Sequence, residues 1–342
     1  MLNNREGKIN NIRNLLWLPA IYLFLLKCVQ KQKRFLKSEL EPELEPFRRE
    51  NDGSLTEAHF KKIINYYAMG VPSILGESLC VLRGFSFTRE ERLCMSYLGG
   101  ISGILDDLFD EPGKSAAHLE DFIFSPEKLI PATSHEKLLK HFYIKGLSYS
   151  SQPEKIKKAA FEVFKSQQKS LIQKASASEE QITDLSFLKG GNSFLYYRLC
   201  LSHGLDKKEE KMLYQLGGLM QLGNDIFDVW EDFRDGISTI ATSTTDLKKL
   251  RRYFNCELEK THELLATVGF AVKKEKKFKR MINLAIARVY VCLDQFEALA
   301  YTTAGDFIVT KYSRKQLICD MQKPVNQLKA ISYYLGSRIN FD

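Results

Sequence analysis

The sequence predicts an all-α protein built as a single helical bundle, and three observations favour that fold class. Hydrophobic residues make up 44% of the 342 residues, which supports a large core and excludes a chain that is disordered throughout. Patterns of alternating apolar and polar residues bounded by turns are few, so strands are not expected. No linker rich in proline, glycine or serine, no low-complexity segment and no internal repeat divides the chain. We therefore expect one domain over residues 1–342.

The first 36 residues are expected to form an amphipathic helix that packs on the bundle. Residues 14–26 are mostly apolar and follow three basic residues, which imitates a secretory signal. No cleavage site of small residues comes after them, and further lysines follow instead. As a helix these 13 residues span about 20 Å, short of the roughly 30 Å of a bilayer core. Peripheral membrane contact stays open as an alternative.

Capping residues and helix breakers place the other helices. Ser54, with Glu57 three residues later, is expected to cap a helix that runs to about Leu82. This helix contains Gly70, Pro72 and Gly76, so it is either kinked or broken in two. The remaining helices are expected over residues 88–110, in short pieces within 117–150, and over 154–175, 184–202, 206–234, 245–267, 275–301 and 307–335.

A glycine pair, Gly190-Gly191, lies inside the helix expected over residues 184–202. Each glycine in a helix costs about 1 kcal/mol relative to alanine. Such a pair therefore marks either a break in the helix or a close approach of two backbones.

The helix expected over residues 206–234 carries an acidic stripe near its end. Steps of four residues place Asn224, Asp228 and Asp232 on one face. The apolar residues around them are numerous enough to bury much of this helix, namely Leu222, Ile226, Phe227, Val229, Trp230 and Phe233. Unpaired buried carboxylates are costly, and a divalent cation is the usual remedy. The alternative is an acidic face that meets solvent.

A second acidic cluster stands at the end of the helix expected over residues 88–110. Asp106 and Asp110 lie one helical turn apart with Asp107 beside them, and Pro112-Gly113 stops the helix. Two clusters of oxygen ligands can hold hard cations such as magnesium, which substrate phosphates normally complete. The two clusters together therefore suggest a diphosphate substrate.

The two clusters resemble the metal motifs of isoprenoid synthases. Asp106-Asp107-Leu-Phe-Asp110 is similar to their DDxxD motif, and residues 221–232 are similar to their second metal motif. The second motif is like that of squalene and phytoene synthases and closer to the large terpene synthases typified by tetraprenyl-beta-curcumene synthase. Lys189-Gly190-Gly191 and the opening from Trp17 to Leu26 also resemble that group. The resemblance implies a terpene synthase helical bundle with a central active-site cavity.

The same resemblance implies a magnesium-dependent terpene cyclase. It would ionise a linear polyprenyl diphosphate of C15 to C25 or longer, release diphosphate and cyclise the allylic carbocation. The metal ligands implied for about three Mg²⁺ ions, with Mn²⁺ as a substitute, are Asp106, Asp107, Asp110, Asn224, Asp228 and Asp232.

The resemblance also implies substrate-binding residues. A helix break at Gly190 or Gly191 would turn a carbonyl dipole toward the cation, with Lys189 or Arg198 near the diphosphate. Aromatic faces attract cations, and the side chains expected to line the pocket are Phe109, Phe194, Tyr196, Tyr197, Phe227 and Trp230. We expect a monomer or a homodimer.

Two other functions remain open. A head-to-head prenyltransferase of the squalene or phytoene synthase type uses the same acidic spacing, but a Gly-Arg pair follows its second motif, whereas Ile237 follows Gly236 here. The other is a non-catalytic helical protein that binds prenyl diphosphates, and the intact ligands in both clusters argue against it.

Charge and cysteine content bound the partners and the compartment. The net charge of +8 comes mostly from dispersed lysines and arginines without a nucleic-acid-binding motif, so no nucleic-acid partner is expected. The seven cysteines are scattered and form no CxxC pair. They are interpreted as buried thiols in a reducing compartment, which indicates a cytoplasmic protein with neither a zinc site nor disulfides.

Overall fold

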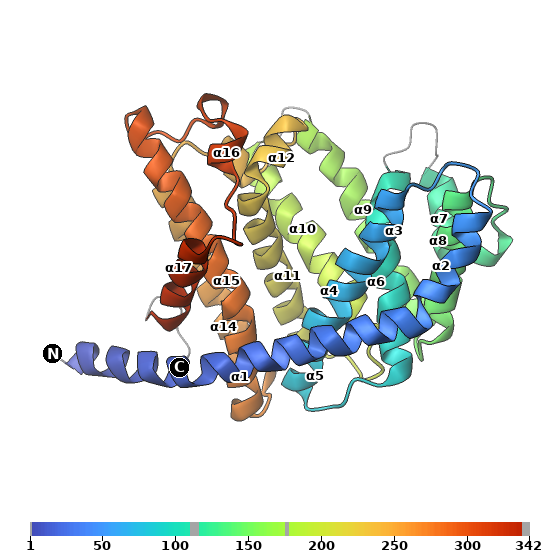
Figure 1. Cartoon of the computed structure of the whole chain (residues 1–342), viewed down its shortest axis with the longest axis horizontal. Coiled ribbons are helices and arrows are strands. Elements are labelled where there is room, and N and C mark those ends of the chain that lie inside the picture. Colours follow the sequence, from blue (N-terminus) through green and yellow to red (C-terminus); the bar gives the residue numbers. More distant parts are fainter. Residues whose placement is uncertain (1, 110–115, 175–177, 337–342) are drawn as a thin grey trace. The chain divides into compact units, whose positions relative to one another are not determined.

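The computed structural model of the chain describes residues 2–109, 116–174 and 178–336, with side chains described over 15–105, 118–173 and 178–336. Every regular element within those ranges is a helix (Figure 1). The expected all-α class is therefore confirmed.

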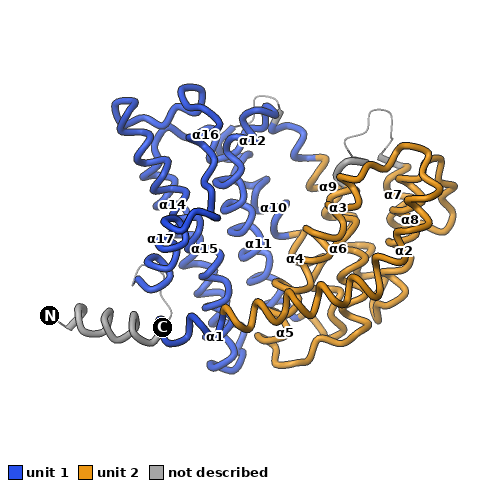
Figure 2. Tube along the Cα trace, viewed as in Figure 1, with its two compact units in different colours: residues 1–21, 169–191, 206–342 blue, residues 22–168, 192–205 orange. Residues whose placement is uncertain are grey.

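The chain divides into two compact units (Figure 2). Unit 1 comprises residues 1–21, 169–191 and 206–342, and unit 2 comprises residues 22–168 and 192–205. Neither unit is a continuous piece of chain, because α1 (Leu2–Glu39), α9 (Pro153–Ser170) and α10 (Glu179–Arg198) each contribute residues to both. The expectation of one domain over the whole chain stays a prediction.

Unit 2 is arranged around α6 (Arg89–Phe109), which packs against α8 (Ser134–Ser148) and against a long helical run before it. That run comprises α3 (Glu57–Lys62), η1 (Ile63–Tyr67), α4 (Ala68–Gly70), η2 (Val71–Gly76) and α5 (Glu77–Arg83). The other elements of unit 2 are α2 (Glu41–Arg49), α7 (Ala116–Phe124) and η3 (Pro126–Lys128).

The run from Glu57 to Arg83 does not break in two, so one of the two expected forms is wrong. It is a continuous helix in which η1 and η2 are π-helical turns, and the expected kink stays a prediction. Its N-cap is Thr56 instead of Ser54, since the Thr56 side chain accepts from the His59 N–H.

Ser54 is already engaged elsewhere, which explains the shift of the cap by two residues. Its hydroxyl donates to Asp52 Oδ1 at 2.6 Å and accepts from the His135 N–H at 3.0 Å. Those partners tie the segment before α3 to α8, and sequence spacing gives no signal of them.

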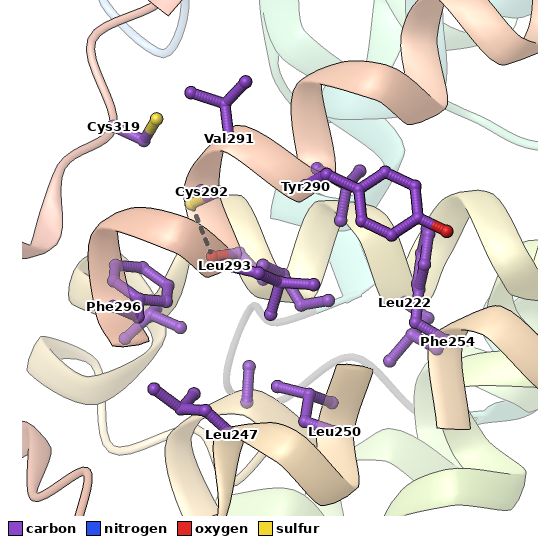
Figure 3. Close-up of a cluster of buried hydrophobic side chains, with 14 of the residues drawn as sticks. Leu222, Leu247, Leu250, Phe254, Tyr290, Val291, Cys292, Leu293, Phe296 and Cys319 are labelled. Atoms are coloured by element: carbon purple, nitrogen blue, oxygen red, sulfur yellow. Dashed lines mark hydrogen bonds between the residues drawn. The ribbon is translucent and has the colours of Figure 1, made fainter. Parts of the chain in front are cut away.

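Unit 1 is built around α11 (Lys207–Phe227), α14 (Leu247–Val268) and α15 (Val272–Ala300), which pack on one another. Its other elements are η4 (Leu171–Lys174), α12 (Val229–Arg234), α13 (Ile240–Ser243), η5 (Tyr301–Thr303), η6 (Val309–Lys311), α16 (Arg314–Leu317) and α17 (Pro324–Leu335). Figure 3 shows part of the core, where Leu222 of α11 meets Phe254 of α14 and Tyr290 of α15. The thiol of Cys292 donates to the Ile226 carbonyl at 3.5 Å.

The α11–α12 segment ends close to the bounds expected for it, 206–234, and local signals in the sequence account for both ends. The Asp206 side chain caps α11 by accepting from the N–H groups of Lys208 and Glu209. Gly236 follows α12 with φ of 68°, and Ile237 donates its N–H to the Asp232 carbonyl at 2.8 Å. This is the glycine-ended arrangement that relieves a left-handed residue of a Cβ clash.

Two expectations for unit 1 are wrong. The helix expected over residues 307–335 is divided into two short elements, η6 and α16, and the longer α17. Pro324 is in the first turn of α17, where a missing N–H is tolerated. Cys256 is exposed, whereas the other six cysteines are buried; none is in a disulfide.

The helix α1 contributes to both units by one buried face. Leu18 belongs to the core of unit 1, and Gln32 is buried in unit 2, where its amide donates to the Ala68 carbonyl and the Ser96 hydroxyl. None of the described helices has the length and apolar character needed to cross a bilayer.

The helix α10 crosses α11 at a pair of glycines. A Cβ on Gly190 would lie 2.1 Å from the Gly217 carbonyl oxygen, and a Cβ on Gly217 would lie 2.2 Å from the Gly190 carbonyl oxygen. The helix is continuous through Gly190 and Gly191, so the expected break is wrong and the close approach of two backbones is confirmed.

We predict that Gly190→Ala lowers the free energy of unfolding by about 3 kcal/mol or prevents folding, because neither backbone at the crossing can yield to a methyl group. Urea unfolding followed by circular dichroism measures the change. The matched control is Gly70→Ala, a helical glycine with no atom within 4 Å of its Cβ position, which should be neutral or stabilising by about 0.5 kcal/mol. Equal stabilities of the two variants would contradict the assigned role of the crossing.

Candidate acidic site on α11 and α12

Asn224, Asp228 and Asp232 keep their common stripe in the structure, although the helix is interrupted. α11 ends at Phe227 and α12 starts at Val229, with Asp228 between them at φ −92° and ψ 16°. The backbone spacing of one turn survives, because Asp228 donates its N–H to the Asn224 carbonyl at 2.9 Å and Asp232 donates to the Asp228 carbonyl at 2.8 Å. The Asn224 amide donates to Asp228 Oδ2 at 2.8 Å. The stripe is therefore coupled through side chains as well.

Asp225 is a further member of the site that the spacing argument missed. Its carboxylate is buried, with Ser186 Oγ donating to Oδ2 at 2.7 Å and Gln221 Nε2 donating to Oδ1 at 2.8 Å. Being next to Asn224 in sequence, it lies about 100° from the stripe. The available signal was Gln221, which stands four residues earlier on the same face.

The carboxyl groups of this site resist ionisation. Burial raises the pKa of Asp225 against the opposing effect of the Ser186 and Gln221 hydrogen bonds. Burial also raises the pKa of Asp228, and the nearby acids add to it. The pKa of Asp232 is raised to about 7, first by burial and then by the charges of Asp225 and Asp228. Three acids that share a half-buried site create a strong demand for positive charge.

Lys189 supplies part of that charge from α10. Its ammonium lowers the pKa of both Asp225 and Asp232, so it stands near them. Lys189 and Ser186 are both on α10, and the crossing at Gly190 holds that helix against α11. Lys189 thus acts on two acids of this site, and its expected place near a diphosphate stays a prediction.

The expected aromatic residues fall into two sets. Phe227 and Trp230 are half-buried and pack against the core of unit 1. In unit 2, Phe194 is half-buried, Tyr196 is buried with its ring 5.3 Å from that of Tyr197, and the Tyr197 hydroxyl donates to Ser102 Oγ at 2.7 Å.

Arg198 is fully buried in unit 2 and is held by the turn after α10. Its guanidinium donates to the carbonyl oxygens of His203 and Gly204, each at 3.1 Å. Arg198 therefore holds the backbone of this turn, a structural role that the family resemblance did not imply.

The first acidic cluster is described only in its backbone. Asp106, Asp107 and Phe109 belong to the last turns of α6, as expected. Their side chains, and Asp110 altogether, lie outside the described residues.

The donors on the stripe suit a hard cation. Two carboxylates and one amide, all oxygen donors, are the ligand type that Mg²⁺ prefers, and Mg²⁺ completes its shell with water or phosphate. Within the described side chains no group of three or more His, Cys, Asp or Glu residues converges as a metal site. The stripe by itself therefore offers only the oxygens of Asp228, Asp232 and the Asn224 amide, and the expected metal ligation stays a prediction.

A groove of about 640 Å³ lies elsewhere on unit 1, between α10, α11 and α14. Phe187, Tyr214 and Tyr253 are among the residues that line it. Its lining includes neither Asp228 nor Asp232, so this groove is not the cavity that the family resemblance implies.

We predict that Asp232 makes the metal-free protein less stable as pH rises. Its folded-state pKa of about 7 exceeds its unfolded value of 3.8, so the protonated acid stabilises the fold fully below the lower value. That stability is lost as pH rises through about 7. In a chelator, the melting temperature of the wild type should fall more steeply between about pH 4 and about pH 7 than that of Asp232→Asn.

The control for this measurement is Glu259→Gln, which changes an exposed carboxylate on α14. Its pH profile should run parallel to that of the wild type. If Asp232→Asn also runs parallel, Asp232 titrates normally and the raised pKa is wrong.

The sequence and the structure were compared with known proteins, and no relative was found. No family model matches the chain, and no curated protein or solved structure matches it.

Proposed function

We propose that the chain is a Mg²⁺-dependent terpene synthase. It would ionise a linear polyprenyl diphosphate, release diphosphate and fold the remaining allylic carbocation into a cyclic terpene. One observation supports this most: on the stripe, the exposed Asn224 stands one turn from Asp228 and Asp232, which are half-buried and have raised pKa values, and Lys189 lowers the pKa of Asp232 from nearby. A site with this demand for positive charge suits metal ions that carry a diphosphate.

The proposal assigns ligands on two grounds. Asn224, Asp228 and Asp232 are assigned from their shared face and electrostatics. Asp106, Asp107 and Asp110 are assigned on the DDxxD spacing alone. When bound, magnesium would neutralise the charge that develops on the departing diphosphate.

The chain's own residues would orient the site for magnesium and diphosphate. The Asn224 amide orients Asp228 by donating to one of its oxygens, and the second oxygen would then be the one to hold a cation. Lys189 would contact the diphosphate, because an ammonium beside the acids is where a phosphate oxygen approaches with least repulsion. Asp225, with both oxygens in hydrogen bonds, would act as a fixed negative charge and not as a ligand.

We predict that Asp106→Asn and Asp228→Asn each lower turnover by about a hundredfold or more while the fold persists, because each removes a metal ligand at nearly constant volume. Turnover and far-ultraviolet circular dichroism are measured on the same samples. Chelation should abolish the wild-type activity, and neither flavin nor nicotinamide should be required. Asp235→Asn, an exposed acid of the same segment, is the matched control and should be active.

A binding measurement separates loss of ligation from damage to catalysis. Mg²⁺ with inorganic pyrophosphate should raise the melting temperature of the wild type and of Asp235→Asn, but not that of Asp228→Asn. Near-normal turnover in both Asp106→Asn and Asp228→Asn would refute the metal assignment.

We predict that the aromatic residues shape the product more than they hold the substrate. Competing carbocation routes change their ratio tenfold for about 1.4 kcal/mol, which is within reach of one cation–π contact. Phe194→Ala and Trp230→Ala should therefore alter product ratios or release early alcohols, with little change in the Michaelis constant. Gas chromatography of the products tests this. An unchanged spectrum at normal rate would assign both rings to the core.

Substrate range is tested by incubation with C10, C15, C20 and C25 diphosphates, with and without a reduced nicotinamide. Cyclic products that need no nicotinamide support the proposal. A reduced C30 product that appears only with nicotinamide would identify a head-to-head prenyltransferase instead.

A further inference from the structure

The helix α1 exposes an apolar face over its middle three turns. Leu16, Leu23 and Leu26 are 73%, 58% and 53% exposed, and Leu15 and Tyr22 are exposed beside them. At about 100° per residue, these five side chains fall within roughly 120° of the helix circumference. The opposite side of α1 is the buried one and carries Leu18, Ile21, Cys28, Gln32 and Leu36. The exposed leucines therefore form a stripe that the described part of the chain leaves uncovered.

The next turns of the same helix face are basic. Lys27, Lys33, Arg34 and Lys37 are exposed, and helical spacing places Lys33 in line with Leu15 and Arg34 in line with Leu16. None of these four basic residues pairs with an acid among the described residues. No aspartate or glutamate occurs between Leu15 and Ser38. One helix face thus passes from apolar to cationic along its length.

We propose that this face of α1, Leu15 to Lys37, binds an anionic lipid surface, with the helix lying in the plane of the membrane. The leucines and Tyr22 would enter the boundary between headgroups and acyl chains, and the basic residues would contact headgroup phosphates and carboxylates. Trp17 anchors the helix to the protein from the side, since the Arg280 guanidinium stacks over its ring at 4.9 Å. The proposal does not depend on the proposed catalytic activity.

Charge complementarity favours lipid over a second copy of the chain. If two α1 helices paired in parallel through this face, their basic turns would lie opposite each other. If they paired antiparallel, the lysines of one copy would lie against the leucines of the other. Either arrangement leaves cations without counter-charges, because this stretch holds no acid. An anionic bilayer satisfies both halves of the face at once.

The test is flotation of the full chain with vesicles. Wild type should float with vesicles of phosphatidylcholine that contain phosphatidylserine, bind at least tenfold more weakly to phosphatidylcholine alone, and be released by high salt. Leu16→Glu with Leu23→Glu, and separately Lys33→Glu with Arg34→Glu, should each weaken binding to the anionic vesicles at least tenfold. Circular dichroism and melting temperature verify that the variants are folded.

Matched controls exist on the same chain. Val325→Glu with Leu328→Glu changes two exposed apolar residues on α17, and Lys273→Glu with Lys274→Glu changes two exposed adjacent lysines on α15. Both control variants should bind vesicles as the wild type does. The proposal is overturned if the wild type ignores anionic vesicles, or if the double leucine variant binds them normally. It is also overturned if analytical ultracentrifugation without lipid shows a dimer that only the double leucine variant loses, because the face would then join two copies.

Discussion

The close crossing of α10 and α11 is the constraint on which the candidate site depends. The carbonyl oxygen of each glycine lies where a Cβ on the other would stand, so no other residue fits at Gly190 or Gly217 without a shift of the backbone. The crossing fixes the distance between the two helices, and that distance brings Ser186 to the buried Asp225. Lys189 is held beside the acids by the same contact. Gly190, which as a glycine would weaken an isolated helix, thus sets the spacing of a charged site through its contact with Gly217.

The acids of the site are stabilised very unequally. Asp225 has one donor on each of its two oxygens, and Asp228 has the Asn224 amide. Among the described residues Asp232 has no side-chain donor and has only the nearby charge of Lys189. The result is a graded set of carboxyl groups on one short segment. A group without donors is the one whose charge state answers most readily to a bound cation.

Local sequence signals predicted well the features that depend on residues close together in the chain, namely helix ends and helix faces. Asp206 and Gly236 mark the ends of α11 and α12 because a cap and a left-handed glycine act within one turn. The stripe of Asn224, Asp228 and Asp232 follows from the same periodicity. The sequence did not reveal the Asp52 and His135 contacts of Ser54, which moved the cap to Thr56, because those partners come together only in the fold. Asp225 was missed for a similar reason, since its donor Ser186 lies on another helix.

At the break between α11 and α12, the Asp228 carboxylate takes no part in capping either helix. An aspartate before a helix usually caps the first turn, but the Asp228 side chain makes no such bond and accepts from Asn224 instead. Neither α11 nor α12 therefore relies on the acid for its own stability. Replacing the acid at position 228 therefore removes no helix cap, so the charge of this segment can change while the two helices keep their ends.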